Sequence, residues 1–341
     1  MMIRRPNTFP WAVLIAVVTF NLALAQAPPP SILTIDVANF VLYNGDISDV
    51  LAFAKNPNIT PSKIGPGTGS GEFSVTTVLA DIVAVNGQPA KGLFAARTRV
   101  IAASPNPTPG TAIADVTRNG IREQIFELLQ PDGTPIGNIV ALGFDGGPPP
   151  PGTPLTQRGG NWAIVGGTGA FLGVRGQMGG TGRQSGLRAT SMAEDPANRR
   201  VNGGGTSQYV LHLIPMWRPE VVTTAGGPAV AHSSDFTLVS ASKPATAGEV
   251  LSLFATGLGP VRSGIAPDQP FPSNPLAVVN SPVEVTVNGN PAEVLAAVGF
   301  PGAVDGYQVN FRVPPDTAKG AASIRVAAAW IAGAPVSIMV Q

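Results

Sequence analysis

The sequence predicts an all-β protein of two domains, and three features of its composition lead to this class. Charged residues make up only 12% of the 341 residues, which is about half of the usual share. Glycine and proline, at 41 and 35 residues, together reach almost twice their usual frequency of about 12%. Hydrophobic residues make up 44%, which excludes a disordered chain. Many turn formers between runs of valine, isoleucine and threonine favour numerous short strands, and the length favours two domains.

The N-terminus has the three parts of a secretory signal peptide, which we place at residues 1–25. A pair of arginines supplies positive charge, residues 11–24 form an apolar run, and a small-x-small cleavage motif ends at Ala25. The run is shorter than the roughly 20 residues that span a bilayer, and an uncleaved anchor is the alternative. We expect a mature chain that begins at Gln26, export to the periplasm or the cell exterior, and no transmembrane segment after cleavage.

Residue counts exclude several classes of site. Cysteine is absent, which excludes disulfides and thiolate metal sites. Histidine occurs only at His212 and His232, which excludes a histidine-rich metal centre. The formal net charge is +1 before the two signal-peptide arginines are removed, so the chain has no electrostatic footprint for nucleic acid. We therefore expect no metal and no nucleic-acid partner.

Residues 26–216 alternate strand-like runs with polar loops rich in glycine and proline, and we assign them to a first domain. Asn86-Gly87 and Asp132-Gly133 separate such runs and predict hairpin turns. The segment GIREQIFELL at 120–129 has apolar residues at helical spacing, yet an Asp-Gly turn and another strand follow it, and we predict a strand. The other runs are ILTIDVANFVLY, EFSVTTVLADIVAV, GLFAARTRVIAA, GNIVALGF, NWAIVGG and SQYVLHLI.

A linker is predicted at 217–230, because this stretch lacks large apolar residues after Val222 and contains a Gly-Gly-Pro break. We expect few contacts to cross it. Residues 231–341 then carry seven strand-like runs, with Asn288-Gly289 as one hairpin turn. Seven short strands with regular turn signals predict a β-sandwich of immunoglobulin type.

The glycine-rich stretch NWAIVGGTGAFLGVRGQMGGTG at 161–182 raises the question of a nucleotide site. A dinucleotide loop requires Gly-x-Gly-x-x-Gly at the start of a helix, but the third glycine position is Leu172. The many glycines that follow would each cost a helix about 1 kcal/mol, so no stable helix is expected there. The stretch instead predicts a sharp structural turn between two strands, and we expect no cofactor.

The residues of this turn resemble the strand–turn–strand signature of dirigent proteins and their allene oxide cyclase relatives. The resemblance is carried by Gly166, Gly167, Thr168 and Gly169, then by Phe171, Arg175 and Gly176. It implies an antiparallel, eight-stranded, calycin-like barrel around an elongated apolar cavity. It also implies a small-molecule pocket, which in that family sometimes cyclises or orients a reactive intermediate without a cofactor.

The second domain resembles an immunoglobulin-like C-terminal domain that recurs in secreted bacterial proteins. The matching pieces are AGEVLSLFATGLGP, PVEVTVNGNPAEVL and GYQVNFRVP, which cover most of residues 245–314. This resemblance implies an accessory module without a catalytic role. We expect it to contact a surface, a polymer or a protein partner.

Candidate pocket residues are Arg175, Asp81 and Phe171. The resemblance places Arg175 after the turn, where a guanidinium would bind an anion or an oxyanion, and a solvent-facing arginine is the alternative. Asp81 shares a strand face with Val75 and Leu79, which would make it a buried acid with a raised pKa or a strand-end residue that reaches solvent.

Two functions remain open from the sequence. The first is an exported, non-enzymatic protein whose barrel binds a small apolar or aromatic ligand. The alternative is a cofactor-independent isomerase or cyclase, or a dirigent-type guide of radical coupling. A weaker third idea is carbohydrate binding by the second domain, in which Trp217 and Trp330 would be stacking platforms rather than core residues.

Overall fold

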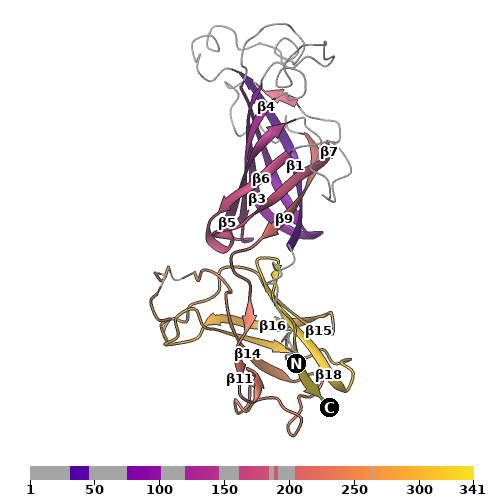
Figure 1. Ribbon diagram of the computed structural model, residues 1–341, viewed down its shortest axis with the longest axis vertical. Helices are drawn as coiled ribbons and strands as arrows, with labels where there is room; N and C mark the ends of the chain where they lie inside the picture. The colour runs from indigo at the N-terminus through magenta and orange to yellow at the C-terminus, as the bar shows by residue number, and fades with distance from the viewer. Residues whose placement is uncertain are drawn as a thin grey trace, which may run out of the picture.

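The computed structural model describes residues 31–45, 75–100, 120–145, 161–183, 188–190, 204–262, 264–266 and 268–341. Two β domains follow one another along the long axis of the molecule (Figure 1). The described ranges contain no α-helix and one 3₁₀ turn, η2 (Gly169–Phe171), so the predicted all-β class is confirmed. No helix in these ranges is long and apolar enough to cross a membrane. The predicted signal peptide lies outside them.

The first domain is an antiparallel barrel of eight strands, as predicted. The barrel closes because the first strand pairs with the second on one side and with the ninth on the other. A short additional strand, β8 (Arg188–Thr190), pairs in parallel with the end of the first strand. The eight strands are β1 (Ser31–Gly45), β2 (Val75–Val85), β3 (Gln88–Val100), β4 (Gly120–Leu129), β5 (Pro135–Asp145), β6 (Asn161–Gly167), β7 (Arg175–Arg183) and β9 (Gly204–Ile214).

Strand β4 shows how the sequence alternates between the two faces of the barrel wall. Every second residue from Gly120 to Leu128 is buried, while Ile121 and Ile125 are more than 40% exposed. The strand predicted for 120–129 is therefore confirmed. Its apolar residues at helical spacing belong to two different faces, because successive side chains of a strand point to opposite sides.

The predicted hairpin turns join the expected strands. Asn86 and Gly87 both have positive φ, 51° and 75°, which is the two-residue turn that an Asn-Gly pair favours. The loop between β4 and β5 is longer than this two-residue turn and spans residues 130–134. The Gln130 N–H donates to the Thr134 carbonyl at 2.8 Å across the loop, and Gly133 is its residue with positive φ. Both turns lie at the barrel end that faces the second domain (Figure 1).

The second domain is one nine-stranded antiparallel sheet that curls over on itself. Strand β16 (Asn290–Gly299) belongs to both halves, because its first residues pair with β15 and the rest pair with β17. The buried core contains residues from both halves, including Leu253, Phe311 and Ile324. The remaining strands are β10 (Glu220–Val221), β13 (Val230–His232), β14 (Val250–Thr256), β15 (Val283–Val287), β17 (Tyr307–Arg312), β18 (Gly320–Ala328), β19 (Ile331–Ala332) and β20 (Val336–Val340), and β11 (Thr223–Thr224) with β12 (Gly227–Pro228) forms a separate ribbon.

The predicted linker at 217–230 is mostly folded into the second domain. Strand β10 pairs with β14, and Val221 and Val230 are both buried in the second core. Residues 215–219 alone join the last barrel strand to β10. The small side chains suggested a loose connection, but main-chain pairing with a strand some thirty residues away orders this stretch.

Contacts across the junction are more extensive than the sequence suggested. The Asn280 side-chain amide donates to the Pro135 carbonyl oxygen at 2.5 Å, and the main-chain oxygen of Asn280 accepts a hydrogen bond from the Gln130 side chain. Ala329 and Ile331, at the tip of the β18–β19 hairpin, are buried in the hydrophobic core of the barrel. The second domain therefore covers one end of the barrel.

Candidate functional site

The glycine turn after β6 packs against backbone on several sides. Gly169 has φ of 61°, and a Cβ atom there would lie 2.4 Å from the Ile136 carbonyl oxygen. A Cβ atom at Gly176 would lie 1.8 Å from the His212 carbonyl oxygen. Real Cβ atoms do not approach backbone oxygens so closely, so any larger residue at either position would displace a neighbouring strand.

This turn closes the barrel end that faces the second domain. The Thr168 N–H donates to the Asn138 carbonyl at 3.0 Å, which ties the turn to β5. Phe171 is 1% exposed and belongs to the barrel core, together with Ala329 and Ile331 of the second domain. Within the described residues, Phe171 is thus a packing residue at a closed end.

Arg175 and Asp81 lie on the outer face of the barrel wall. Arg175 is exposed and donates from Nη1 to the Val174 carbonyl at 2.9 Å, while Met178 on the same strand is buried inside. Asp81 is half-buried and accepts a hydrogen bond of 2.9 Å from the Asn39 side chain. The barrel therefore does not bring Arg175, Asp81 and Phe171 together, and their role as a pocket stays a sequence-based prediction.

A different set of side chains converges inside the barrel, toward the end farther from the second domain. The register of β3, β4 and β5 sorts the inward residues into three successive rows. The row nearest the middle is apolar, the next has one amide between two alanines, and the outermost has one arginine between a threonine and a glycine. These rows are Phe94, Phe126 and Ile139; Ala96, Gln124 and Ala141; and Thr98, Arg122 and Gly143.

Arg122 carries a permanent positive charge into this interior. Its side chain is only 4% exposed. The guanidinium carbon lies 5.4 Å from the centre of the Trp162 ring and 5.9 Å from that of Phe94, and Nη2 donates a long hydrogen bond of 3.5 Å to the Tyr209 hydroxyl. Aromatic faces attract cations within about 6 Å, so Trp162 and Phe94 hold the guanidinium in a defined orientation.

Gln124 is the most unusual residue of the set. It is 0% exposed, and among the described residues neither its amide nitrogen nor its amide oxygen has a hydrogen-bond partner. The indole nitrogen of Trp162, which is 3% exposed, lacks a partner in the same part of the structure. A buried polar group without a partner costs about 1–3 kcal/mol, so the barrel retains these groups at a cost to its own stability.

Arg122 and Gln124 were not predicted as site residues from the sequence, although the strand that carries them was predicted correctly. Each face of this strand mixes polar and apolar residues, because Arg122, Glu123 and Gln124 are three consecutive polar residues, so either face qualified as the inner one. Phe126 and Leu128 could have identified the inner face. They lie on the same face of the strand as Arg122 and Gln124, and they are large apolar residues that are expected to be buried.

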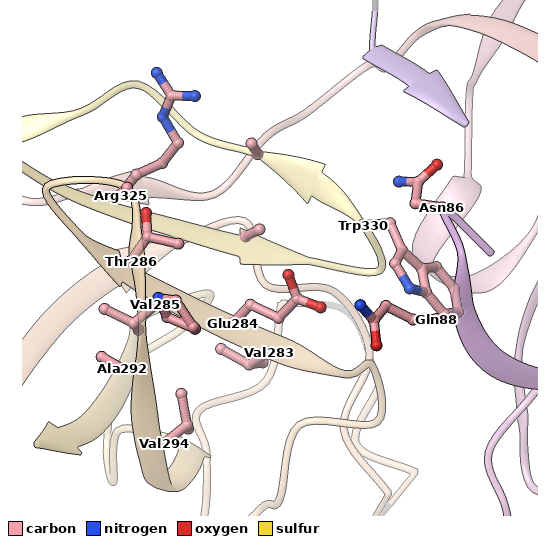
Figure 2. A pocket seen from close by; sticks show the side chains of 14 residues that line it. Asn86, Gln88, Val283, Glu284, Val285, Thr286, Ala292, Val294, Arg325 and Trp330 are labelled. Atoms are coloured by element: carbon pink, nitrogen blue, oxygen red, sulfur yellow. The ribbon is translucent and has the colours of Figure 1, made fainter. Parts of the chain in front are cut away.

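A concave site lies at the junction of the two domains (Figure 2). This groove has a volume of about 800 Å³, and β15, β16 and β18 supply most of its lining. Glu284 points from β15 toward Gln88 of the barrel and Trp330 of the hairpin tip (Figure 2). Thr286 and Arg325 lie at the opposite end of the groove (Figure 2).

Comparisons with known proteins add no further assignment. No protein-family model matches the chain, and no curated protein matches it significantly. The two resemblances described from the sequence stay predictions.

Proposed function

We propose that the barrel binds a small molecule with an aromatic or apolar body and an anionic group. The observation that carries the proposal is the wholly buried Gln124 amide, which has no partner at either end among the described residues and lies one row from the Arg122 guanidinium. Buried polar groups are normally hydrogen-bonded. A ligand whose carboxylate accepts a hydrogen bond from the Gln124 amide nitrogen accounts for the donor half of this exception.

Charge favours an anionic group on the ligand. A guanidinium presents five N–H donors in a planar fork that matches a carboxylate. Inside a barrel the effective dielectric constant is low, so an ion pair there is stronger than in water. Arg122, Gln124 and the Trp162 indole N–H form a set of donors to which a carboxylate would bind.

The neighbouring row favours an aromatic or apolar body. The rings of Phe94 and Phe126 lie 4.9 Å apart, and Tyr209 contacts both at 4.8 and 5.2 Å. Ala96 and Ala141 flank Gln124 in register and place no side-chain atom beyond Cβ beside it. An aromatic body that enters from the outer row would therefore meet small side chains first and aromatic rings beyond them.

The wider proposal concerns the exported protein. The charged, apolar and small-residue parts of the N-terminal signal motif support export of the mature chain. The second domain serves as an accessory module that closes one end of the barrel. Mass spectrometry of secreted material tests export, and an N-terminus at Gln26 is the expected result.

Ligand binding is tested by titration calorimetry with cinnamate and with cinnamyl alcohol, which share one apolar skeleton and differ in charge. We expect cinnamate to bind more tightly to the wild-type protein. Arg122→Met should weaken cinnamate at least tenfold, about 1.4 kcal/mol, and remove the preference over the alcohol. Absence of cinnamate binding to the wild-type protein would contradict the proposal.

The matched control is Arg175→Met, which removes an exposed guanidinium from the outer face of the same barrel. We expect it to leave the affinity for cinnamate unchanged. Loss of binding in this variant, with Arg122→Met unaffected, would instead support the site predicted from the sequence. Circular dichroism shows whether each variant has folded.

A further inference from the structure

We infer that the groove at the domain junction is a second binding site, and that its ligand is a neutral saccharide. The site is separate from the barrel interior, because its lining comes from the outside of the β2–β3 hairpin and from the second domain. Its volume of about 800 Å³ lies within the range of roughly 300–1,000 Å³ that small-molecule sites occupy.

The lining has the chemistry that a sugar requires. A pyranose ring presents C–H groups that pack on an aromatic face, and its hydroxyls both donate and accept hydrogen bonds. Trp330 supplies the aromatic ring, while Gln88, Glu284 and Thr286 supply donors and acceptors (Figure 2). Gln88 and Glu284 line the groove and are both exposed, so their polar ends are available to a ligand.

The charged side chains that line the groove favour a neutral ligand. Glu284 and Arg325 are the charged side chains that line the groove, and their charges cancel. They lie on one outer face of the sheet, because Thr286 is paired with Arg325 and Glu284 with Ala327. A charged ligand long enough to span the groove would meet one attractive and one repulsive group, whereas the hydroxyls of a neutral sugar can accept from one and donate to the other.

Backbone conformation supports a dedicated role for Trp330. Ala329 and Trp330 both have positive φ, 49° and 62°. This region disfavours a side chain as bulky as indole, and residues held in it concentrate at functional sites. The Ala329 N–H donates to the Pro282 carbonyl at 3.0 Å, and Ile331 pairs with Ala328, so the hairpin holds Trp330 at the groove despite this cost.

The experiment is titration calorimetry of the full mature chain with cellotetraose, xylotetraose and chitotetraose. We expect at least one of them to bind with a measurable Kd. Gln88→Ala and Glu284→Gln change exposed side chains and should each weaken that saccharide at least fivefold, and Trp330→Ala should abolish binding. Trp330→Phe keeps a ring at the site and should retain most of the affinity. Failure of all three saccharides to bind would overturn the inference.

Two controls locate the site. Glu220→Gln removes an exposed carboxylate that lies outside the groove and should leave saccharide affinity unchanged. In the variant Trp162→Phe/Trp217→Phe, Trp330 is the remaining tryptophan of the mature chain, and its fluorescence should shift when the saccharide binds. Saccharide binding that survives both Gln88→Ala and Trp330→Ala would place the ligand elsewhere and overturn the inference. Gln124→Leu tests the barrel independently and should not affect saccharide binding.

Discussion

The side-chain amide of Asn280 in the second domain donates a hydrogen bond of 2.5 Å to the main-chain carbonyl oxygen of Pro135 in the barrel. Asn280 is 7% exposed, and its own main-chain oxygen accepts from Gln130 on the same barrel loop. One residue of the second domain thus holds the start of β5 and the end of β4 together. The two domains are coupled at this point.

Asn280→Ala should weaken the coupling between the domains. The substitution removes the hydrogen bond to the Pro135 carbonyl, which we expect to cost about 0.5–1.5 kcal/mol. Differential scanning calorimetry should show one transition in the wild-type protein and two resolved transitions in the variant. Asn290→Ala, at an exposed position of β16, is the control and should keep the single transition. A single transition of unchanged midpoint in Asn280→Ala would refute the coupling.

Gly169→Ala should destabilise the barrel more than the same change at Gly133. Both glycines have positive φ, but a Cβ atom at Gly133 would meet nothing within 4 Å, whereas at Gly169 it would lie 2.4 Å from a carbonyl oxygen. Positive φ costs a non-glycine residue about 1–2 kcal/mol, and we expect roughly 2 kcal/mol more at Gly169 from the steric contact. Urea unfolding followed by circular dichroism measures both, and equal losses would show that the turn adjusts freely.

Gln124→Leu should raise the stability of the ligand-free barrel. Leucine keeps a similar volume and removes the two buried amide ends that lack partners, so we expect a gain of about 1–2 kcal/mol in the free energy of unfolding. Gln177→Leu, at a half-buried position of β7, is the control and should change stability by less than about 0.5 kcal/mol. A marked loss of stability in Gln124→Leu would mean that the amide has a structural partner.

Glu249 should make the second domain sensitive to acid. Burial raises the pKa of this carboxyl, but hydrogen bonds from His232 and Thr246 outweigh it, and the pKa lies below its ordinary value of 4.5. Because the folded pKa is lower than the unfolded one, the stabilisation is complete above about pH 4.5 and is lost as the pH falls through the folded pKa.

Glu249→Gln should therefore lower the free energy of unfolding by about 1–2 kcal/mol at about pH 7, with a smaller difference from wild type at about pH 3. Urea unfolding at the two pH values measures the effect. Glu293→Gln is the control, because its carboxylate pairs with Arg312 at a side-chain exposure of 61% and surface ion pairs contribute little. A pH-independent difference for Glu249→Gln would exclude the ionised carboxylate as its cause.

Local signals in the sequence predicted most of the strands and the two Asn-Gly turns, because alternation and left-handed asparagine and glycine are properties of neighbouring residues. The Ala329-Trp330 turn carries no such signal, since packing of Ala329 into the barrel core compensates for its backbone conformation. The structure of residues 220–230 also carries no local signal, because it depends on pairing with a strand that is distant in sequence.

The candidate site was less predictable than the fold. Arg122 and Gln124 come from one strand whose two faces look alike in sequence, and only closure of the barrel decides which face becomes the interior. The groove requires the β2–β3 hairpin to meet the β18–β19 hairpin, more than 200 positions later in the chain. No periodicity or motif in the sequence predicts that these two hairpins lie next to each other.

The covered end of the barrel has a kinetic consequence. Phe171 and the hairpin of the second domain obstruct one end, so a molecule bound beside Arg122 would neither enter nor leave through that end. Association and dissociation would then share the remaining route, and any change along it would alter both rate constants in the same direction. A narrower route would therefore lengthen the residence time of the bound molecule while its dissociation constant stayed nearly the same.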